Sequence, residues 1–218
     1  MKKVWIFLIF NCFIAFSAIS TNTIINIFQT ENLDENLDDM TNAEIIASVD
    51  LGKFSPMIQK FQYNEAINLR NGKYHKNSGC NVETLRNREI IIVTIPTDYL
   101  FLPNDITLID GGEEYLIPLK RYLRVPDMYR VILVMHTDNT GSDTYTDNLA
   151  LDRVDAVFEW FEKNGSDTKY LFPTASGATE PLLPNISGEN RAKNRRLEIY
   201  LIPGRKMLEE AKKGKIAL

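Results

Sequence analysis

The residues best suited to chemistry in this chain lie in the segment 131–153, VILVMHTDNTGSDTYTDNLALDR. An apolar run, which predicts a buried strand, ends at His136, Thr137 and Asp138, and a polar loop containing Gly141 follows. The apolar spacing after this loop predicts a helix that carries Arg153 about two turns from its start. A carboxylate at a strand end and a guanidinium on the next helix give a site with two opposite charges. Such a site suits a zwitterion, such as an amino acid or a peptide end, and does not suit a nucleic acid.

Asp138 and Arg153 also allow a simpler interpretation, because a strand-end aspartate that faces a helix arginine often forms an internal salt bridge. The two residue types alone do not separate a ligand site from a structural ion pair. The motifs around them, taken in order along the chain, carry more information.

Further motifs accompany the charge pair. They are, in order, MHTDNTG at 135–141, Leu149, Gly177, Pro181, Asn185 and NRRLE at 194–198. In this order they resemble the OmpA-like domain family, which includes the periplasmic domains of outer-membrane protein A, peptidoglycan-associated lipoproteins and flagellar stator proteins. The resemblance covers roughly residues 88–203, a little over half of the chain.

The resemblance implies a non-catalytic site for the peptide stem of peptidoglycan. The family ligand is typically meso-diaminopimelate, whose side chain ends in an ammonium and a carboxylate on one carbon. Asp138 matches the family aspartate that takes the ammonium, and Arg153 matches the family arginine that takes the carboxylate, at the family spacing of 15 residues. Arginine suits this role because its planar fork binds a carboxylate through two hydrogen bonds, which lysine cannot reproduce. An analogue that lacks one charge would leave a buried partner unpaired, at a cost of ~2–5 kcal/mol.

Thr137, Asn104 and Thr146 occupy further family positions near the ligand. The Thr137 hydroxyl and the amides of residues 139–141 are expected to hold the ligand backbone, although Gly141 is equally consistent with a plain turn. For Asn104 the alternative is a turn-capping role. Thr146 stands where the family usually has an asparagine that contacts the ligand, so this contact is expected to be weakened or retuned.

Arg195 and Arg196 alternate on a predicted strand, so only one of them can face the site. Arg195 is the candidate for a ligand contact, and Glu198 is expected to pair with the other arginine. His136 has no second histidine or nucleophile beside it, so we interpret it as a structural histidine at the end of a strand.

Hydrophobic patterning predicts an α+β fold in the order β-α-β-α-β-β. The predicted strands are residues 88–97, 129–136, 170–175 and 196–202, and helical spacing recurs from 110 to 123 and from 150 to 161. Pro118 is expected to interrupt the first helix, and Asn164-Gly165 to end the second. This order gives a mixed sheet with helices packed against it, the OmpA-like sandwich that the resemblance implies.

Composition excludes several classes of function. The 218-residue chain is 44% hydrophobic and 25% charged, as expected for one globular domain with accessory segments. Its net charge of −4 offers no basic excess for a phosphate backbone, so no nucleic-acid partner is expected. His75 and His136 are the only histidines and lack the spacing of zinc ligands, so neither a metal nor a cofactor is expected. Cys80 is expected to be an inert thiol or to form an intermolecular disulfide.

The N-terminus predicts a signal peptide over residues 1–20. Lys2 and Lys3 precede an apolar run of about 16 residues, and Ala18-Ile19-Ser20 fits a cleavage site. The alternative is an uncleaved membrane anchor, although the run is short of the ~20 residues that span a bilayer.

The rest of the chain divides into three predicted parts. Residues 21–85 form an acidic spacer and a small helical region that is interrupted by Gly52 and Pro56. Residues 86–203 form the peptidoglycan-binding domain, and residues 204–218 form a charged, helical tail.

Two functions are consistent with these observations. The first is non-covalent binding of the peptidoglycan stem by a secreted protein, periplasmic or associated with the outer membrane of a Gram-negative-type bacterium, without enzymatic activity. The second is a structural role in an envelope machine for motility or secretion, in which residues 21–85 contact a membrane-protein partner and the wall-binding domain is a tether. A homodimer is compatible with both, and the sequence does not specify the preferred stem peptide.

Overall fold

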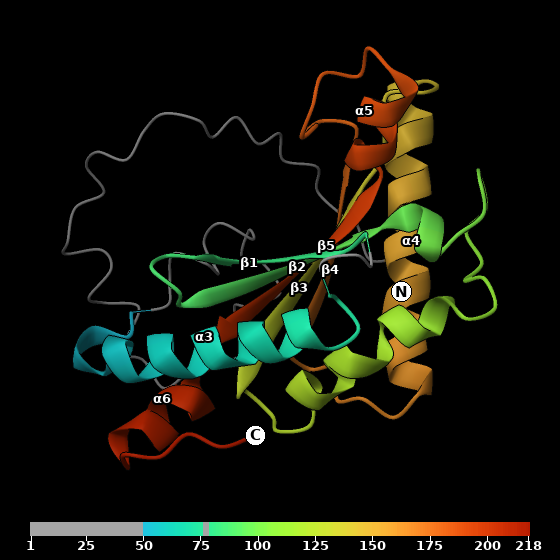
Figure 1. The fold of residues 1–218 in the computed structure, drawn as a ribbon. Helices are drawn as coiled ribbons and strands as arrows, with labels where there is room; N and C mark the ends of the chain where they lie inside the picture. Colours follow the sequence, from blue (N-terminus) through green and yellow to red (C-terminus); the bar gives the residue numbers. More distant parts are fainter. Residues whose placement is uncertain (1–49, 76–78) are drawn as a thin grey trace. The chain divides into compact units, whose positions relative to one another are not determined.

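The computed structural model describes residues 50–75 and 79–218 (Figure 1). The expected signal peptide and the expected acidic spacer up to residue 49 lie outside the described residues. Within the described ranges, no helix has the length and apolar character needed to cross a membrane.

A five-stranded mixed sheet forms the centre of the described part of the chain. Its strands are β1 (Asn81–Leu85), β2 (Ile90–Pro96), β3 (Tyr129–His136), β4 (Leu171–Gly177) and β5 (Arg196–Pro203), in the spatial order β1-β2-β5-β3-β4. The pair β3–β4 is parallel and the other neighbours are antiparallel. All eight residues of β3 are buried, as its continuous apolar sequence predicts for a strand covered on both faces.

The described residues also form helices. They are α3 (Ser55–Asn71), α4 (Asp143–Lys163), α5 (Gly188–Asn194) and α6 (Arg205–Lys212), with short 3-10 helices η2 (Gly52–Phe54), η3 (Thr97–Tyr99), η4 (Gly112–Tyr115) and η5 (Ile117–Leu123). In Figure 1, α3 packs against β1 and β2, whereas α4 packs against β3 and β4. The predicted α+β fold with a mixed sheet is therefore confirmed.

Helix α4 begins at Asp143, nearly three turns before Arg153, so it starts earlier than the two turns that the sequence predicts. The Ser142 side chain accepts a hydrogen bond from the Tyr145 amide, which satisfies one of the free donors at the helix start. Ala150, Val154 and Phe161 are buried along one face, as the apolar stripe predicts. The helix ends at Asn164-Gly165, where Gly165 adopts the left-handed conformation.

The segment 110–123 differs from its prediction, because it contains two 3-10 helices and no α-helix. The residue before the first of these is Gly111, in the left-handed conformation (φ 84°), and Asp110 does not cap the helix. Pro118 lies in the first turn of η5, where its missing N–H is tolerated, and the break between the two 3-10 helices falls at Leu116 and not at this proline.

The N-terminal helical region is described only from residue 50 onward. Pro56 lies in the first turn of α3, where proline is well tolerated, and the 17-residue helix has no break. The edge strand β1, which pairs with β2, was not predicted at all. The C-terminal helix α6 lies within the expected charged tail, and its Met207 and Ala211 are buried.

A polar network as well as apolar packing joins α3 to the sheet. Gln62 is fully buried; its amide nitrogen donates to the Glu89 carbonyl at 2.8 Å, and its oxygen accepts a hydrogen bond from Tyr129 at 2.7 Å. One turn further on, Glu65 accepts a hydrogen bond from Tyr122 at 3.0 Å. Because buried polar groups must be paired, this network fixes the position of α3 along the sheet.

Candidate ligand-binding site

Asp138 lies just beyond the C-terminal end of β3. The strand pairing continues past a register shift between Met135 and His136, and the Thr137 amide donates to the Gly177 carbonyl at 2.8 Å. Asp138 is 7% exposed. Its Oδ1 accepts a hydrogen bond from the Thr140 amide at 2.8 Å, which orients the carboxylate within its own loop.

Arg195 provides the cationic partner of Asp138. Its Nη1 lies 2.9 Å from Asp138 Oδ2, and its Nε and Nη2 donate to the two oxygens of Asp98 at 3.2 and 2.9 Å. One guanidinium therefore joins two carboxylates, one after β3 and one on η3. The neighbouring Arg196 is buried and pairs with Glu198 at 2.7 Å.

The electrostatics of this cluster favour its charged forms. Burial alone would raise the pKa of Asp138, but the hydrogen bonds from Thr140 and Arg195 outweigh it and hold the pKa below its usual value. The hydrogen bond with Asp98 raises the pKa of Arg195, which is opposed by partial burial.

Arg153 projects from α4 and is 4% exposed. Its Nε donates to the Asp105 carbonyl at 2.8 Å, its Nη2 donates to the Leu102 carbonyl at 3.0 Å, and its guanidinium lies 5.0 Å from the centre of the Phe101 ring. The guanidinium has no carboxylate partner among residues 50–75 and 79–218, so the internal salt bridge between Asp138 and Arg153 does not form there.

This environment leaves Arg153 short of negative charge. Burial lowers the pKa of Arg153, yet a guanidinium remains protonated at neutral pH. Backbone carbonyls provide only partial charges, and Asp98 and Asp105 favour the charged form of Arg153 without forming an ion pair with it in the described ranges. The surroundings of Arg153 are therefore suited to an incoming carboxylate.

Asn104 and Tyr145 join the two loops of the site. Asn104 is exposed, adopts the left-handed conformation (φ 59°), and its Oδ1 accepts a hydrogen bond from the Tyr145 hydroxyl at 3.0 Å. The Tyr145 ring lies close to Gly141 (φ 114°), where an added Cβ would meet ring atom Cδ1 at 2.8 Å. Gly141 therefore serves both a turn and the close approach of an aromatic ring.

Thr137 and Thr146 are both buried but differ in how their hydroxyls are used. Thr146 Oγ1 donates to the Asp143 carbonyl at 2.9 Å, one turn back in its own helix. Thr137 Oγ1 has no hydrogen-bond partner within the described ranges. Of the two hydroxyls, that of Thr137 is the one available for a further contact beside Asp138.

His136 is part of a buried structural cluster and is 1% exposed. Its Nε2 lies 3.5 Å from Glu198 Oε2, and Glu198 also accepts a hydrogen bond from Tyr200 at 2.8 Å. Burial alone would raise the pKa of Glu198, but His136 and Arg196 hold it at about 2. This cluster lies across β3 and β5 and fixes the strand ends from which Asp138 and Arg195 emerge.

The residues expected to form a site thus fall into two linked groups. Asp138 and Arg195 form one group, with Asp98 as a member that sequence reasoning missed. Arg153 forms the other with the loop that holds Asn104, and Tyr145 was also missed. Neither Asp98 nor Tyr145 carries a local sequence signal, because each acquires its partner through the fold. In the portion that the structure describes, no three His, Cys, Asp or Glu side chains converge on a metal position.

Comparison with known proteins agrees with this fold. Residues 100–195 match the model of the OmpA family. Outer membrane protein A of Bordetella avium is 29% identical over 114 residues, which is 52% of this chain and 59% of that protein. The chain thus spans about three fifths of the length of that relative.

Two solved structures share the fold. A putative MotB-like protein from Desulfovibrio vulgaris superposes with a TM-score of 0.61 at 22% identity, over 69% of this chain and 96% of that one. The cell wall anchor of the T6SS from Pseudomonas aeruginosa superposes with a TM-score of 0.55 at 25% identity, over 63% and 96%. Residues 100–195, which contain Asp138, Arg153 and Arg195, are thus similar in sequence to the OmpA family.

Proposed function

We propose that this OmpA-like domain binds the peptide stem of peptidoglycan and thereby holds an envelope protein non-covalently at the cell wall. The observation that carries the proposal is the Arg153 guanidinium, which is 4% exposed, donates to two backbone carbonyls, lies over an aromatic ring and has no ion pair among the described residues. A side chain fixed in this way pays no further ordering cost when a carboxylate arrives.

The ligand is expected to be a zwitterion of the diaminopimelate type. Its carboxylate pairs with Arg153, and its ammonium pairs with Asp138. Arg195 can retain both hydrogen bonds to Asp98 while it shares or releases Asp138 Oδ2, so the ammonium does not leave a buried cation unpaired. The Thr137 hydroxyl and the side chain of Asn104 are available for the remaining polar groups of the ligand.

The relatives support an anchoring role and an envelope location. The Pseudomonas aeruginosa structure, at 25% identity, is that of a cell wall anchor, and the sequence relative is an outer membrane protein. The proposal contains no catalytic step, and the site needs neither a metal nor a cofactor for this binding.

The Pseudomonas aeruginosa anchor also favours the second candidate, a tether within a larger envelope machine. In that case residues 21–85 connect the wall-binding domain to a membrane-protein partner. Deletion of residues 21–49 would separate the two candidates: wall binding should persist in both, but assembly with a membrane complex should be lost only if the chain is such a tether.

The proposal is tested by calorimetric titration of the purified chain with meso-diaminopimelate and with a diaminopimelate-containing stem tripeptide. Lysine serves as the ligand control, because it lacks the second carboxylate. We expect binding of the first two ligands, and a loss of at least about tenfold in affinity for Asp138→Asn and for Arg153→Lys. The second variant keeps the positive charge but removes the fork that binds a carboxylate through two bonds.

Matched controls are Asp152→Asn and Arg124→Ala, which change charge at exposed positions without ion pairs among the described residues. Both controls should bind as the wild type does. If the folded wild-type chain binds no diaminopimelate ligand, or if Asp138→Asn and Arg153→Lys both retain full affinity, the proposal is wrong.

A further inference from the structure

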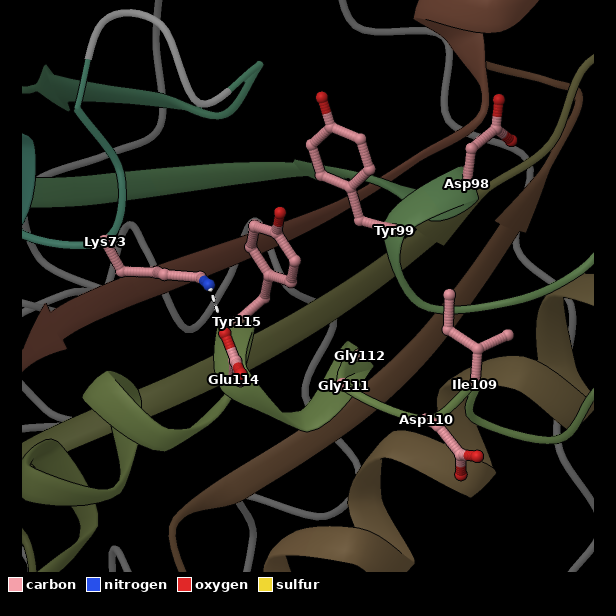
Figure 2. Close-up of a pocket in the computed structure, with 9 residues that line it drawn as sticks. All are labelled: Lys73, Asp98, Tyr99, Ile109, Asp110, Gly111, Gly112, Glu114 and Tyr115. Carbon is pink, nitrogen blue, oxygen red and sulfur yellow. Dashed lines mark hydrogen bonds and ion pairs between the residues drawn. The ribbon is translucent and has the colours of Figure 1, made fainter.

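A pocket borders the charged site. It has a volume of about 270 Å³ and lies between η3, η4 and the turn after α3 (Figure 2). Asp98, the carboxylate that holds Arg195, also lines this pocket. The pocket and the proposed stem site are therefore separated by the width of one guanidinium.

The wall of this pocket contains a pair of aromatic rings. Tyr99 and Tyr115 are stacked, with ring centres 5.0 Å apart and an interplanar angle of 22°. Figure 2 shows their hydroxyls pointing the same way, and both side chains are only partly buried. Partly exposed tyrosines give a ligand both an apolar ring surface and a polar edge.

The floor of the pocket depends on glycine. Gly111 adopts the left-handed conformation (φ 84°), and a Cβ on Gly112 would lie only 3.1 Å from the Tyr99 carbonyl. The backbone can approach η3 this closely because no side chain intervenes. The pocket is thus a built feature of the loop between β2 and η4.

The charges around the pocket are largely paired within the chain. Lys73 lies 2.7 Å from Glu114 and 4.3 Å from the centre of the Tyr115 ring, and Asp98 is paired with Arg195. Asp110 adds a further carboxylate at the rim. An anionic ligand would meet this net negative rim, and no metal-binding group of side chains occurs in the described ranges. A neutral ligand with hydroxyl and amide groups fits best.

We propose that this pocket binds one sugar ring of the peptidoglycan glycan strand, an N-acetylated hexosamine, next to the peptide stem. This inference rests on the proposed stem binding at Asp138 and Arg153. The C–H face of the sugar would contact the Tyr99 ring, which Tyr115 supports by stacking, and its hydroxyl and acetamido groups would bind the carboxylates and Lys73. The volume is slightly below the ~300 Å³ of the smallest drug-sized sites, so it suits a single ring.

The distance between the two sites is compatible with one ligand. A stem peptide joins the glycan strand within a few residues, and an extended residue spans ~3.3–3.6 Å, so about 10 Å separate a diaminopimelate residue from the sugar. The chain Asp138–Arg195–Asp98, with N–O distances of 2.9 Å at each end, places the pocket at a comparable separation.

The test compares two ligands that carry the same diaminopimelate stem, one attached to N-acetylmuramic acid and one with only an acetyl group. Calorimetry on the full chain should give about tenfold tighter binding of the sugar-bearing ligand. Tyr115→Leu and Asp110→Ala should reduce this advantage to about twofold or less, with unchanged affinity for the sugar-free stem. Tyr63→Leu, at an exposed tyrosine on α3, should retain the advantage.

The outcomes separate this inference from the proposed function. If the sugar-free stem binds but the sugar adds no affinity, or if Tyr115→Leu and Asp110→Ala both keep the advantage, the sugar pocket is wrong and the stem site stands. If neither ligand binds the folded chain, the stem site is wrong and the inference falls with it.

Discussion

Arg195 Nη1 lies 2.9 Å from Asp138 Oδ2, so the carboxylate proposed to take a ligand ammonium already has a cationic partner within the chain. The same guanidinium forms two hydrogen bonds with Asp98. Because Asp98 alone can hold Arg195, the guanidinium can release Asp138 without losing its own charge partner. This arrangement keeps a largely buried carboxylate ionised until a competing ammonium arrives.

The first prediction concerns the charge state of Asp138. In Arg195→Gln, burial of the carboxylate is opposed only by the Thr140 hydrogen bond, so the pKa of Asp138 should rise. Carboxyl-carbon NMR titration of labelled aspartate measures this pKa directly. Arg124→Gln, which removes an exposed arginine, should leave it unchanged. An unchanged Asp138 pKa in Arg195→Gln would mean that the ion pair is not maintained in solution.

The second prediction concerns the role of α3. Its buried residues Ile58, Ala66 and Leu69 pack toward the sheet, and Gln62 bonds with Tyr129 on β3. A fragment of residues 80–218 would expose this apolar surface and leave the Tyr129 hydroxyl buried without its partner. We expect the fragment 50–218 to unfold cooperatively in urea and the fragment 80–218 to lose a cooperative transition. Equal transitions in both would restrict the folding unit to the part after α3.

The sequence predicted the central strands well, because β3 is a fully buried and largely apolar run, and β2 and β5 are rich in β-branched and other apolar residues with at least every second position buried. It did not predict β1, since NVETL at residues 81–85 is short and half polar, and its strand conformation depends on pairing with β2. The sequence also did not predict the 3-10 geometry of η5, because the spacing of apolar residues does not distinguish a 3-10 helix from an α-helix over so short a segment.

The candidate site shows the same division. The pattern of Asp138 and Arg153 was visible in the sequence, because both residues lie within one strand–loop–helix unit. The partnership of Asp98 with Arg195 spans 97 positions along the chain and arises only when η3 meets the start of β5. Contacts of this length leave no local spacing, so they require the fold.

The third prediction tests the polar network beneath α3. Gln62→Ala should lower the free energy of unfolding by about 2–4 kcal/mol, because it removes three hydrogen bonds of a fully buried side chain and opens a cavity. Urea denaturation measures this change. Lys60→Ala, at an exposed position on the same helix, is the control and should change stability by less than ~0.5 kcal/mol. A change of that small size for Gln62→Ala would mean that α3 is held by apolar packing alone.

The fourth prediction concerns the end of β4. Gly177 adopts the left-handed conformation (φ 54°), and its carbonyl accepts a hydrogen bond from the Thr137 amide. A Cβ added at Gly177 would collide with the Asp147 side chain on α4. Gly177→Ala should therefore destabilise the protein by about 1–2 kcal/mol. Gly188→Ala is the matched control, because a Cβ there meets no atom and α5 begins at this residue. Thermal denaturation should separate the two variants; similar melting temperatures would contradict the strain assigned to Gly177.

The last prediction uses the pKa of Glu198, which His136 and Arg196 hold at about 2 against the opposing effect of burial. The value in an unfolded chain is about 4.3, so the folded pKa is depressed. The stability that ionised Glu198 contributes is therefore fully present above pH ~4.3 and is lost as the pH falls toward about 2.

Comparison of the wild type with Glu198→Gln isolates this contribution from those of the other carboxylates. The difference in unfolding free energy should be up to about 3 kcal/mol at pH 6 and should shrink toward zero near pH 2. Glu159→Gln, at an exposed position on α4, should give a small difference that hardly changes over the same range. If the difference for Glu198→Gln stays constant from pH 6 to pH 2, the ionised carboxylate does not stabilise the strand ends that carry Asp138 and Arg195.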